Sequence, residues 1–156
     1  MKKLFVFFTA LSLLSSCSRD DGNTGEVPTN QILSGTVQGE LFTFAGGLAF
    51  ETVSLEEQEV LSINLTNTEA GCEESIFDFE LRISATVPAD VGVYEDVNIT
   101  DRNGRNRTPF NNLNQTVEIT AISDTEVSGI LSLNRETTDL QEGSTFGGTF
   151  TVPICE

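Results

Sequence analysis

The strongest constraint on the fold of this chain is a period of two in its apolar residues. In residues 77–84 every second side chain is apolar and the others are polar, and residues 61–65 repeat the pattern. Successive side chains of a β-strand point to opposite faces, so the pattern predicts strands with one buried face. No stretch has the apolar stripe of an amphipathic helix, although residues 136–142 could form one helical turn. An all-β fold is therefore expected.

Similar short runs recur along the chain, and Gln38-Gly39 before one of them is a plausible hairpin turn. They begin near residue 32 and continue at residues 41–44, 48–52, 61–65, 77–83, 91–97, 117–121, 127–133 and 146–154. About eight or nine antiparallel strands predict a β-sandwich, with a closed or partly open β-barrel as the alternative. The sandwich is expected first, because several strands are short and the connection at residues 99–115 is long. Residues 31–156 would form this single domain.

The first residues have the form of a bacterial lipoprotein signal peptide. Lys2 and Lys3 precede an apolar run that is too short for a stable membrane span. The sequence LSSC, which ends at Cys17, resembles a lipobox, in which the cysteine is acylated and becomes the mature N-terminus. We therefore predict a signal peptide at residues 1–16, a lipidated Cys17, and a flexible tether as far as residue 30. The alternative is an ordinary secretory signal with an incidental cysteine.

The residues after Cys17 indicate where the protein resides. Arg19 followed by two aspartates resembles the surface-export signal of Bacteroidota lipoproteins, which implies a lipid-anchored outer-membrane protein at the cell surface, with a periplasm-facing position as the alternative. Loss of the leader with its two lysines would leave six arginines, 24 carboxylates and a formal charge of −18. So acidic a chain repels phosphate backbones, and nucleic acid is not an expected partner.

Cysteine usage predicts one disulfide. With Cys17 modified by lipid, Cys72 and Cys155 remain as an even pair in an oxidising compartment, where bridges persist. Two free thiols are the alternative. A metal site and a cofactor are not expected, because the chain has no histidine.

Short motifs in the C-terminal half occur in a fixed order: VPADVGVY at 87–94, TVEIT at 116–120, VSGIL at 127–131 and GGTFTV at 147–152. Together they resemble an uncharacterised family of lipoprotein β-domains common in Bacteroidota, over residues 85–154. The chain departs from that pattern with Ile130-Leu131, where the family tends to have a phenylalanine, and with an arginine-rich insert after Thr100. The resemblance implies an all-β fold and surface lipoprotein status, and it carries no catalytic residue and no ligand.

The arginine-rich insert is the sharpest local candidate for a binding site. Arg102, Asn103, Arg105, Arg107 and Phe110 could together bind an acidic glycan, because guanidinium groups grip carboxylates and an aromatic ring stacks on sugars. The alternative is an exposed loop whose arginines pair with the acidic body of the molecule. The start of the insert faintly resembles a calcium loop, but an arginine stands where an oxygen ligand is needed.

Catalytic chemistry has little basis in the sequence, and the protein is not expected to be an enzyme. Asp78 and Glu80 would project from one face of a strand, which leaves a carboxylate-based hydrolase as the weakest alternative. A histidine base and a nucleophile elbow are absent from the sequence. The expected role is binding or accessory work on a glycan or a protein ligand at the cell surface. A structural or interaction lipoprotein of an envelope assembly, without a small ligand, is the alternative.

Overall fold

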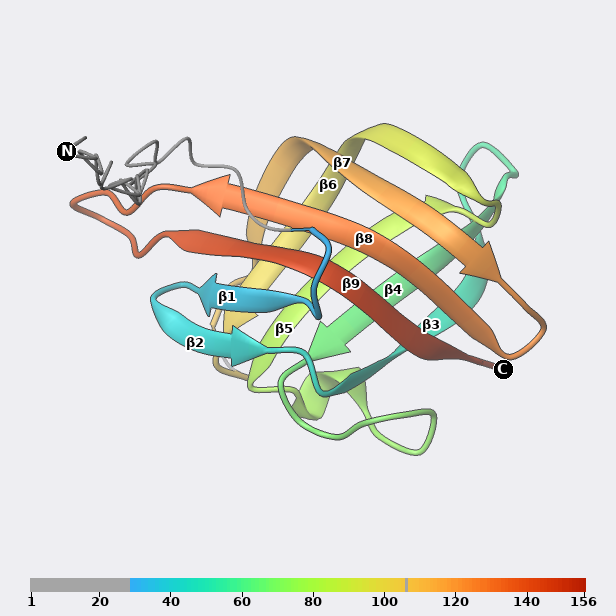
Figure 1. The fold of residues 1–156 in the computed structure, drawn as a ribbon, viewed down its shortest axis with the longest axis horizontal. Coiled ribbons are helices and arrows are strands. Elements are labelled where there is room, and N and C mark those ends of the chain that lie inside the picture. Colours follow the sequence, from blue (N-terminus) through green and yellow to red (C-terminus); the bar gives the residue numbers. More distant parts are fainter. Residues whose placement is uncertain (1–28, 106) are drawn as a thin grey trace, which may run out of the picture.

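The structure is a computed structural model that describes residues 29–105 and 107–156 (Figure 1). The predicted signal peptide at residues 1–16, Cys17 and the predicted tether as far as residue 28 lie outside the described residues. In the described ranges, helical structure is limited to one short 3-10 turn, and no helix has the length and apolar character needed to cross a membrane.

Nine strands make up a single sheet, which confirms the predicted all-β fold. The strands are β1 (Ser34–Val37), β2 (Glu40–Thr43), β3 (Gly46–Val53), β4 (Glu59–Thr66), β5 (Leu81–Pro88), β6 (Gly92–Asn103), β7 (Phe110–Ile122), β8 (Glu126–Arg135) and β9 (Ser144–Cys155). Their order is β2-β1-β9-β3-β4-β5-β6-β7-β8, and an additional pairing of β8 with β9 closes the sheet on itself. Seven strands thus form a closed barrel.

Of the two predicted architectures, the structure has the barrel, which was the alternative, and not the sandwich expected first. The expected long connection at residues 99–115 is mostly a hairpin, because β6 extends to Asn103 and β7 begins at Phe110. Closure depends on β9. One edge of β9 pairs with β8 along most of its length, and the other pairs first with β1 and then, in parallel, with β3 at Ala49 and Phe50.

β-Bulges help the sheet to curve into a closed barrel. The pairing of β6 with β7 shifts register between Tyr94 and Ile99, and that of β7 with β8 shifts between Ile119 and Ala121. Such shifts increase local twist and are common where a sheet curves into a barrel. The alternating apolar residues of the strands fill the interior, which includes the fully buried Ile83 and Phe146. The period of two therefore reflects inward and outward faces of one barrel wall.

The predicted strand at residues 77–83 begins later than expected. Residues Ile76–Asp78 form the 3-10 turn, and β5 starts only at Leu81. This connection folds over the outside of the barrel, where Phe79 packs with Leu48 and Cys155 in a second small apolar cluster. Phe79 thus packs on the outer face while Phe77 is exposed, so the alternation at these two positions does not mark a strand. The expected helical turn at residues 136–142 is likewise absent, and this segment instead connects β8 to β9 with an isolated bridge from Thr138 to Gln141.

The predicted disulfide is present. Cys72 lies in the connection that contains the 3-10 turn, and Cys155 ends β9. The bridge ties this connection to the strand that closes the barrel, over a sequence separation of 83 residues. The small outer cluster is therefore covered by a segment with a covalent attachment.

Candidate binding pocket at the barrel end

The five residues predicted for glycan binding do not converge on one point. Arg102 is buried, and its Nη2 donates to the carbonyl oxygen of Phe79 at 2.8 Å, while Nη1 donates to that of Arg105 at 3.3 Å. The amide of Asn103 donates to the carbonyl oxygen of Gln38 at 3.5 Å. Only Arg107 and Phe110 line a common pocket.

Arg105 instead pairs with the two carboxylates that were predicted to share a strand face. Its guanidinium lies 3.7 Å from Asp78 Oδ1 and 3.4 Å from Glu80 Oε1. All three side chains are more than half exposed, so solvent screens these pairs and each contributes little to stability. For Arg105, the structure therefore has the alternative arrangement, in which an arginine of the insert pairs with carboxylates of the same molecule.

A buried charged network, which sequence analysis missed, lies beneath the pocket. Asp101 on β6 is fully buried, and its Oδ2 accepts from Arg135 Nη2 at 3.0 Å and from Ser144 Oγ at 2.7 Å. Its Oδ1 accepts from Asn112 Nδ2 at 2.6 Å. Burying a carboxylate is costly unless it is paired and fully hydrogen-bonded, and here four different strands supply the partners and the acid.

The sequence held a signal for this network. Asp101 is in phase with Val97 and Ile99, both of which point into the barrel, so it occupies a core-facing position of the same strand. A carboxylate at an apolar position of a period-two pattern indicates a buried partner. The signal is weak because polar residues surround Asp101, which favour a connection over a strand at residues 99–115.

The network extends to the surface, where its side chains contact residues that line the pocket. Arg135 Nη1 donates to the carbonyl oxygen of Glu142 at 2.9 Å, and the guanidinium carbon lies 4.5 Å from the centroid of the Phe110 ring. Gln38 donates from its side chain to the backbone oxygen of Asp101 at 3.0 Å and from its backbone to Ser144 Oγ at 2.8 Å. Buried groups thus position three residues of the pocket, which is preorganised as a result.

The predicted turn at Gln38-Gly39 positions Gln38, which is one of these three pocket residues. Gln38 has a φ of 47° and Gly39 a φ of 82°, both in the left-handed region that a tight two-residue hairpin turn requires. Glycine adopts this backbone readily, whereas a non-glycine residue there is uncommon. The hydrogen bonds of Gln38 to β6 and β9 offset this cost.

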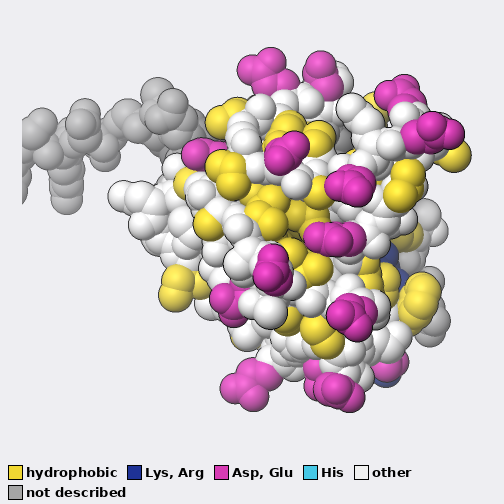
Figure 2. All heavy atoms as spheres, turned by 90° about the vertical axis from the view of Figure 1, so that its right-hand side faces the viewer, with side chains coloured by type: hydrophobic (Ala, Val, Ile, Leu, Met, Phe, Trp, Pro, Cys, Tyr) yellow, Lys and Arg dark blue, Asp and Glu magenta, His cyan; other side chains and the backbone are white. Residues whose placement is uncertain are grey.

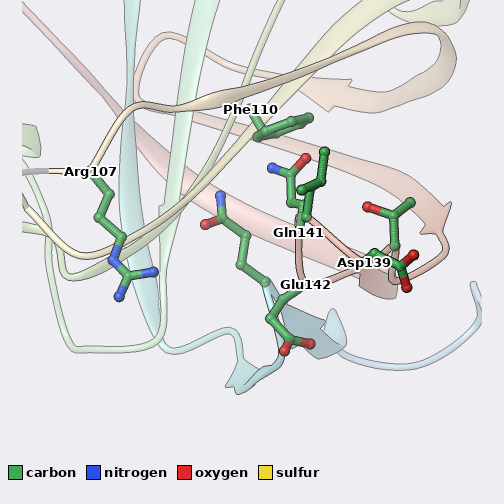
Figure 3. A pocket seen from close by; sticks show the side chains of 8 residues that line it. Arg107, Phe110, Asp139, Gln141 and Glu142 are labelled. Atoms are coloured by element: carbon green, nitrogen blue, oxygen red, sulfur yellow. The ribbon is translucent and has the colours of Figure 1, made fainter.

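The pocket has a volume of about 560 Å³ and lies between the β1–β2 turn, the start of β7 and the connection from β8 to β9. Its lining consists of Gln38, Arg107, Phe110, Thr138, Asp139, Leu140, Gln141 and Glu142. Figure 3 shows Arg107 on one side and Asp139 on the other, with Phe110 and Gln141 between them. Amides, carboxylates, a guanidinium and an aromatic ring therefore face one open space.

This set of groups can bind a small polar molecule by hydrogen bonds and stacking. In the described part of the chain, no three histidine, cysteine, aspartate or glutamate side chains are grouped as metal ligands would be. No family model, no curated protein and no solved structure matches this chain.

Proposed function

We propose that this protein is a lipid-anchored outer-membrane lipoprotein at the cell surface, and that the barrel-end pocket binds a saccharide. The lipobox and Cys17 support the anchor. The observation that carries the binding role is the pocket of about 560 Å³ in which the Phe110 ring is held against Arg135. Binding pockets of this size accommodate small ligands.

A saccharide suits the chemistry of the lining. Sugar hydroxyls both donate and accept hydrogen bonds, and the side-chain amides of Gln38 and Gln141 can do the same. The carboxylates of Asp139 and Glu142 accept from hydroxyl groups. The apolar face of a sugar ring can stack on Phe110, which is fixed in place by the Arg135 guanidinium.

The charge balance favours a neutral sugar in this pocket. Arg107 is the one cation among the described residues that line the pocket, and it faces the two carboxylates of Asp139 and Glu142. An acidic sugar would meet a net negative lining in an acidic protein, so repulsion would oppose its binding. The pocket therefore differs from the acidic-glycan site expected from Arg102, Arg105 and Arg107 together.

A glycan array and calorimetry on the detergent-solubilised lipoprotein test this role. The side chain of Gln141 lines the pocket and makes no hydrogen bond within the described residues, so Gln141→Ala removes a ligand contact without breaking the fold. We expect binding of a neutral oligosaccharide that weakens at least about tenfold in Gln141→Ala, the loss of roughly one good hydrogen bond. Glu118→Gln, an exposed substitution on β7, is the matched control. Wild-type protein that binds no glycan would contradict the proposal.

The opposite end of the barrel favours a protein partner as the second candidate. This end, at the right in Figure 1, faces the viewer in Figure 2, where hydrophobic side chains are surrounded by carboxylates. Val53, Leu55, Val91 and Val93 are large exposed apolar residues in or beside the β3–β4 and β5–β6 turns. An apolar patch with an acidic rim suits a partner with basic residues around an apolar centre. Leu55→Asp should abolish capture of that partner in cross-linking on intact cells.

A further inference from the structure

A second groove lies on the outer wall of the barrel, away from the barrel-end pocket. It has a volume of about 420 Å³ and crosses β4, β5 and β6. The outward-facing residues of these strands form two rows of polar side chains along it. One row is Asn64, Ser84 and Thr100, and the next is Ser62, Thr86 and Asn98.

The next position along β5 is Arg82, which also lines the groove. Its guanidinium is half-buried, and its one hydrogen bond is a long one of 3.4 Å from Nη1 to the carbonyl oxygen of Ile76. Within the described residues, Arg82 has no carboxylate partner. Arg102 and Arg107 are likewise without a carboxylate partner among the described residues, whereas Arg105 and Arg135 are paired, so Arg82 is one of three arginines whose charge no ion pair neutralises.

A second guanidinium strengthens the positive charge at this end of the groove. Arg82 is paired in register with Arg102 on β6, and like charges directly opposite each other in a sheet are destabilising. Arg102 is only 6% exposed, and its Nε has no hydrogen-bond partner among the residues that the structure describes. Burial, and after it the charge of Arg102, lowers the pKa of Arg82. The folded protein therefore holds two cations together, and an anion bound there would relieve their repulsion.

The groove also offers an aromatic surface. Phe77, on the 3-10 turn, lines the groove with a side chain that is 74% exposed, which is unusual for so large an apolar residue. Two strand positions separate residues that share a face, so Arg82 and Ser84 lie about 7 Å apart, the scale of one sugar ring. The hydroxyls of Ser84 and Thr100 lie 2.9 Å from each other and both face outward.

We propose that this groove binds an acidic saccharide, with the sugar carboxylate on Arg82, the sugar ring on Phe77, and the sugar hydroxyls on the Ser84–Thr100 row. The charge selects the acid, because a guanidinium fork matches a carboxylate in geometry as well as in charge. The site is separate from the barrel-end pocket and does not depend on it. Two sites on one barrel would let the protein hold a polysaccharide that contains both neutral and acidic units.

The test is calorimetry on the detergent-solubilised full chain that carries Gln141→Ala, which weakens neutral-sugar binding at the barrel-end pocket, with oligosaccharides of galacturonate, glucuronate and sialic acid. For each sugar, the methyl ester is the matched control, because it keeps the ring and removes the charge. We expect at least one acid to bind and its ester to bind at least tenfold more weakly. Arg82→Gln and Phe77→Ala should each weaken the binding of the acidic sugar at least tenfold.

The variants also distinguish a loss of ligand binding from a loss of folding stability. Arg82→Gln should leave the Tm unchanged or raise it, since it removes one of two facing cations. Arg107→Gln, at the barrel-end pocket, should leave acid binding unchanged, so the two sites can fail independently. Equal binding of acid and ester, no binding of any acid, or full affinity in Arg82→Gln would overturn the proposal. If inorganic sulfate competes as strongly as the saccharide, the groove binds anions without recognising the sugar. That result would also overturn the proposal.

Discussion

Arg135 and Asp101 form an ion pair of 3.0 Å in which the carboxylate is fully buried, and they come from strands β8 and β6. The two other ion pairs of the described residues are exposed. The pair joins the two strands on either side of β7, and Arg135 also donates from Nη1 to the carbonyl oxygen of Glu142 and from Nη2 to Ser144 Oγ. This single contact therefore links the interior to the walls of the pocket.

Asp101→Asn should destabilise the protein strongly. The substitution keeps the shape but removes the charge that Arg135 requires, and breaking one side of a buried pair costs about 3–5 kcal/mol. Urea unfolding followed by circular dichroism measures this loss. Arg135→Met in the Asp101→Asn background should cost less than the sum of the two single changes, because no unpaired buried charge then remains. Additive single effects would show that the pair is not coupled.

Removal of the disulfide should lower stability by about 4 kcal/mol. A bridge that spans 83 residues restricts the unfolded chain, and the effect grows slowly with loop length. Unfolding of Cys72→Ser/Cys155→Ser in urea, compared with the oxidised wild type, gives the difference. Faster amide hydrogen exchange should be confined first to residues 67–80, which the bridge attaches to the barrel. Two alkylatable thiols in the purified wild-type protein would contradict the bridge.

Tyr94 should titrate at a higher pH in the folded protein than in the unfolded chain. Partial desolvation, and after it the Asp90 carboxylate, raises the pKa of the phenol. The neutral form, which donates to the carbonyl oxygen of Asp90 at 2.7 Å, is thus favoured by folding. Its contribution to stability is complete below the unfolded pKa of about 10 and is lost as pH rises through the folded pKa.

An ultraviolet difference titration measures this directly, because the chain has one tyrosine and no tryptophan. The same titration in concentrated denaturant supplies the reference. Asp90→Asn should remove the smaller, electrostatic part of the shift and leave the rest. A folded pKa equal to or below the denatured one would be inconsistent with the environment of Tyr94.

Cys17→Ala should abolish acylation. The lipobox-like sequence that ends at Cys17 predicts that the thiol of this residue carries the diacylglycerol, and alanine has no thiol to acylate. Metabolic labelling with a fatty-acid analogue should mark the wild type only. Equal labelling of both proteins would exclude a lipid on Cys17.

Protease added to intact cells should digest the mature domain. The expectation rests on Ser18-Arg19-Asp20-Asp21, which follow the predicted lipidation site at Cys17 and resemble a surface-export signal. Immunoblotting before and after treatment is the measurement, and a periplasmic protein serves as the control for an intact outer membrane. Protection of the domain until that membrane is broken would place it on the periplasmic side.

Much of the fold could be predicted because strand formation is encoded locally. Leu61, Ile63 and Leu65 are apolar at every second position, and the three side chains indeed fill the barrel interior. The turn at Gln38-Gly39 was predictable for the same reason, since the required backbone depends on the residues of the turn itself. Cys72 and Cys155 could be paired because the predicted lipidation of Cys17 left only these two cysteines.

The sequence alone therefore determined that this chain forms strands, where most of them lie, and that one disulfide joins two of its segments. The tertiary structure decided that the strands close into a barrel, because the pairing of β9 with β3 and β8 depends on contacts between distant residues that a period of two does not record. It also brought Asp101 to Arg135, from strands that no spacing in the sequence connects. Local backbone preference selects the strand, but only the balance of packing and buried charge across the whole sheet selects its neighbours.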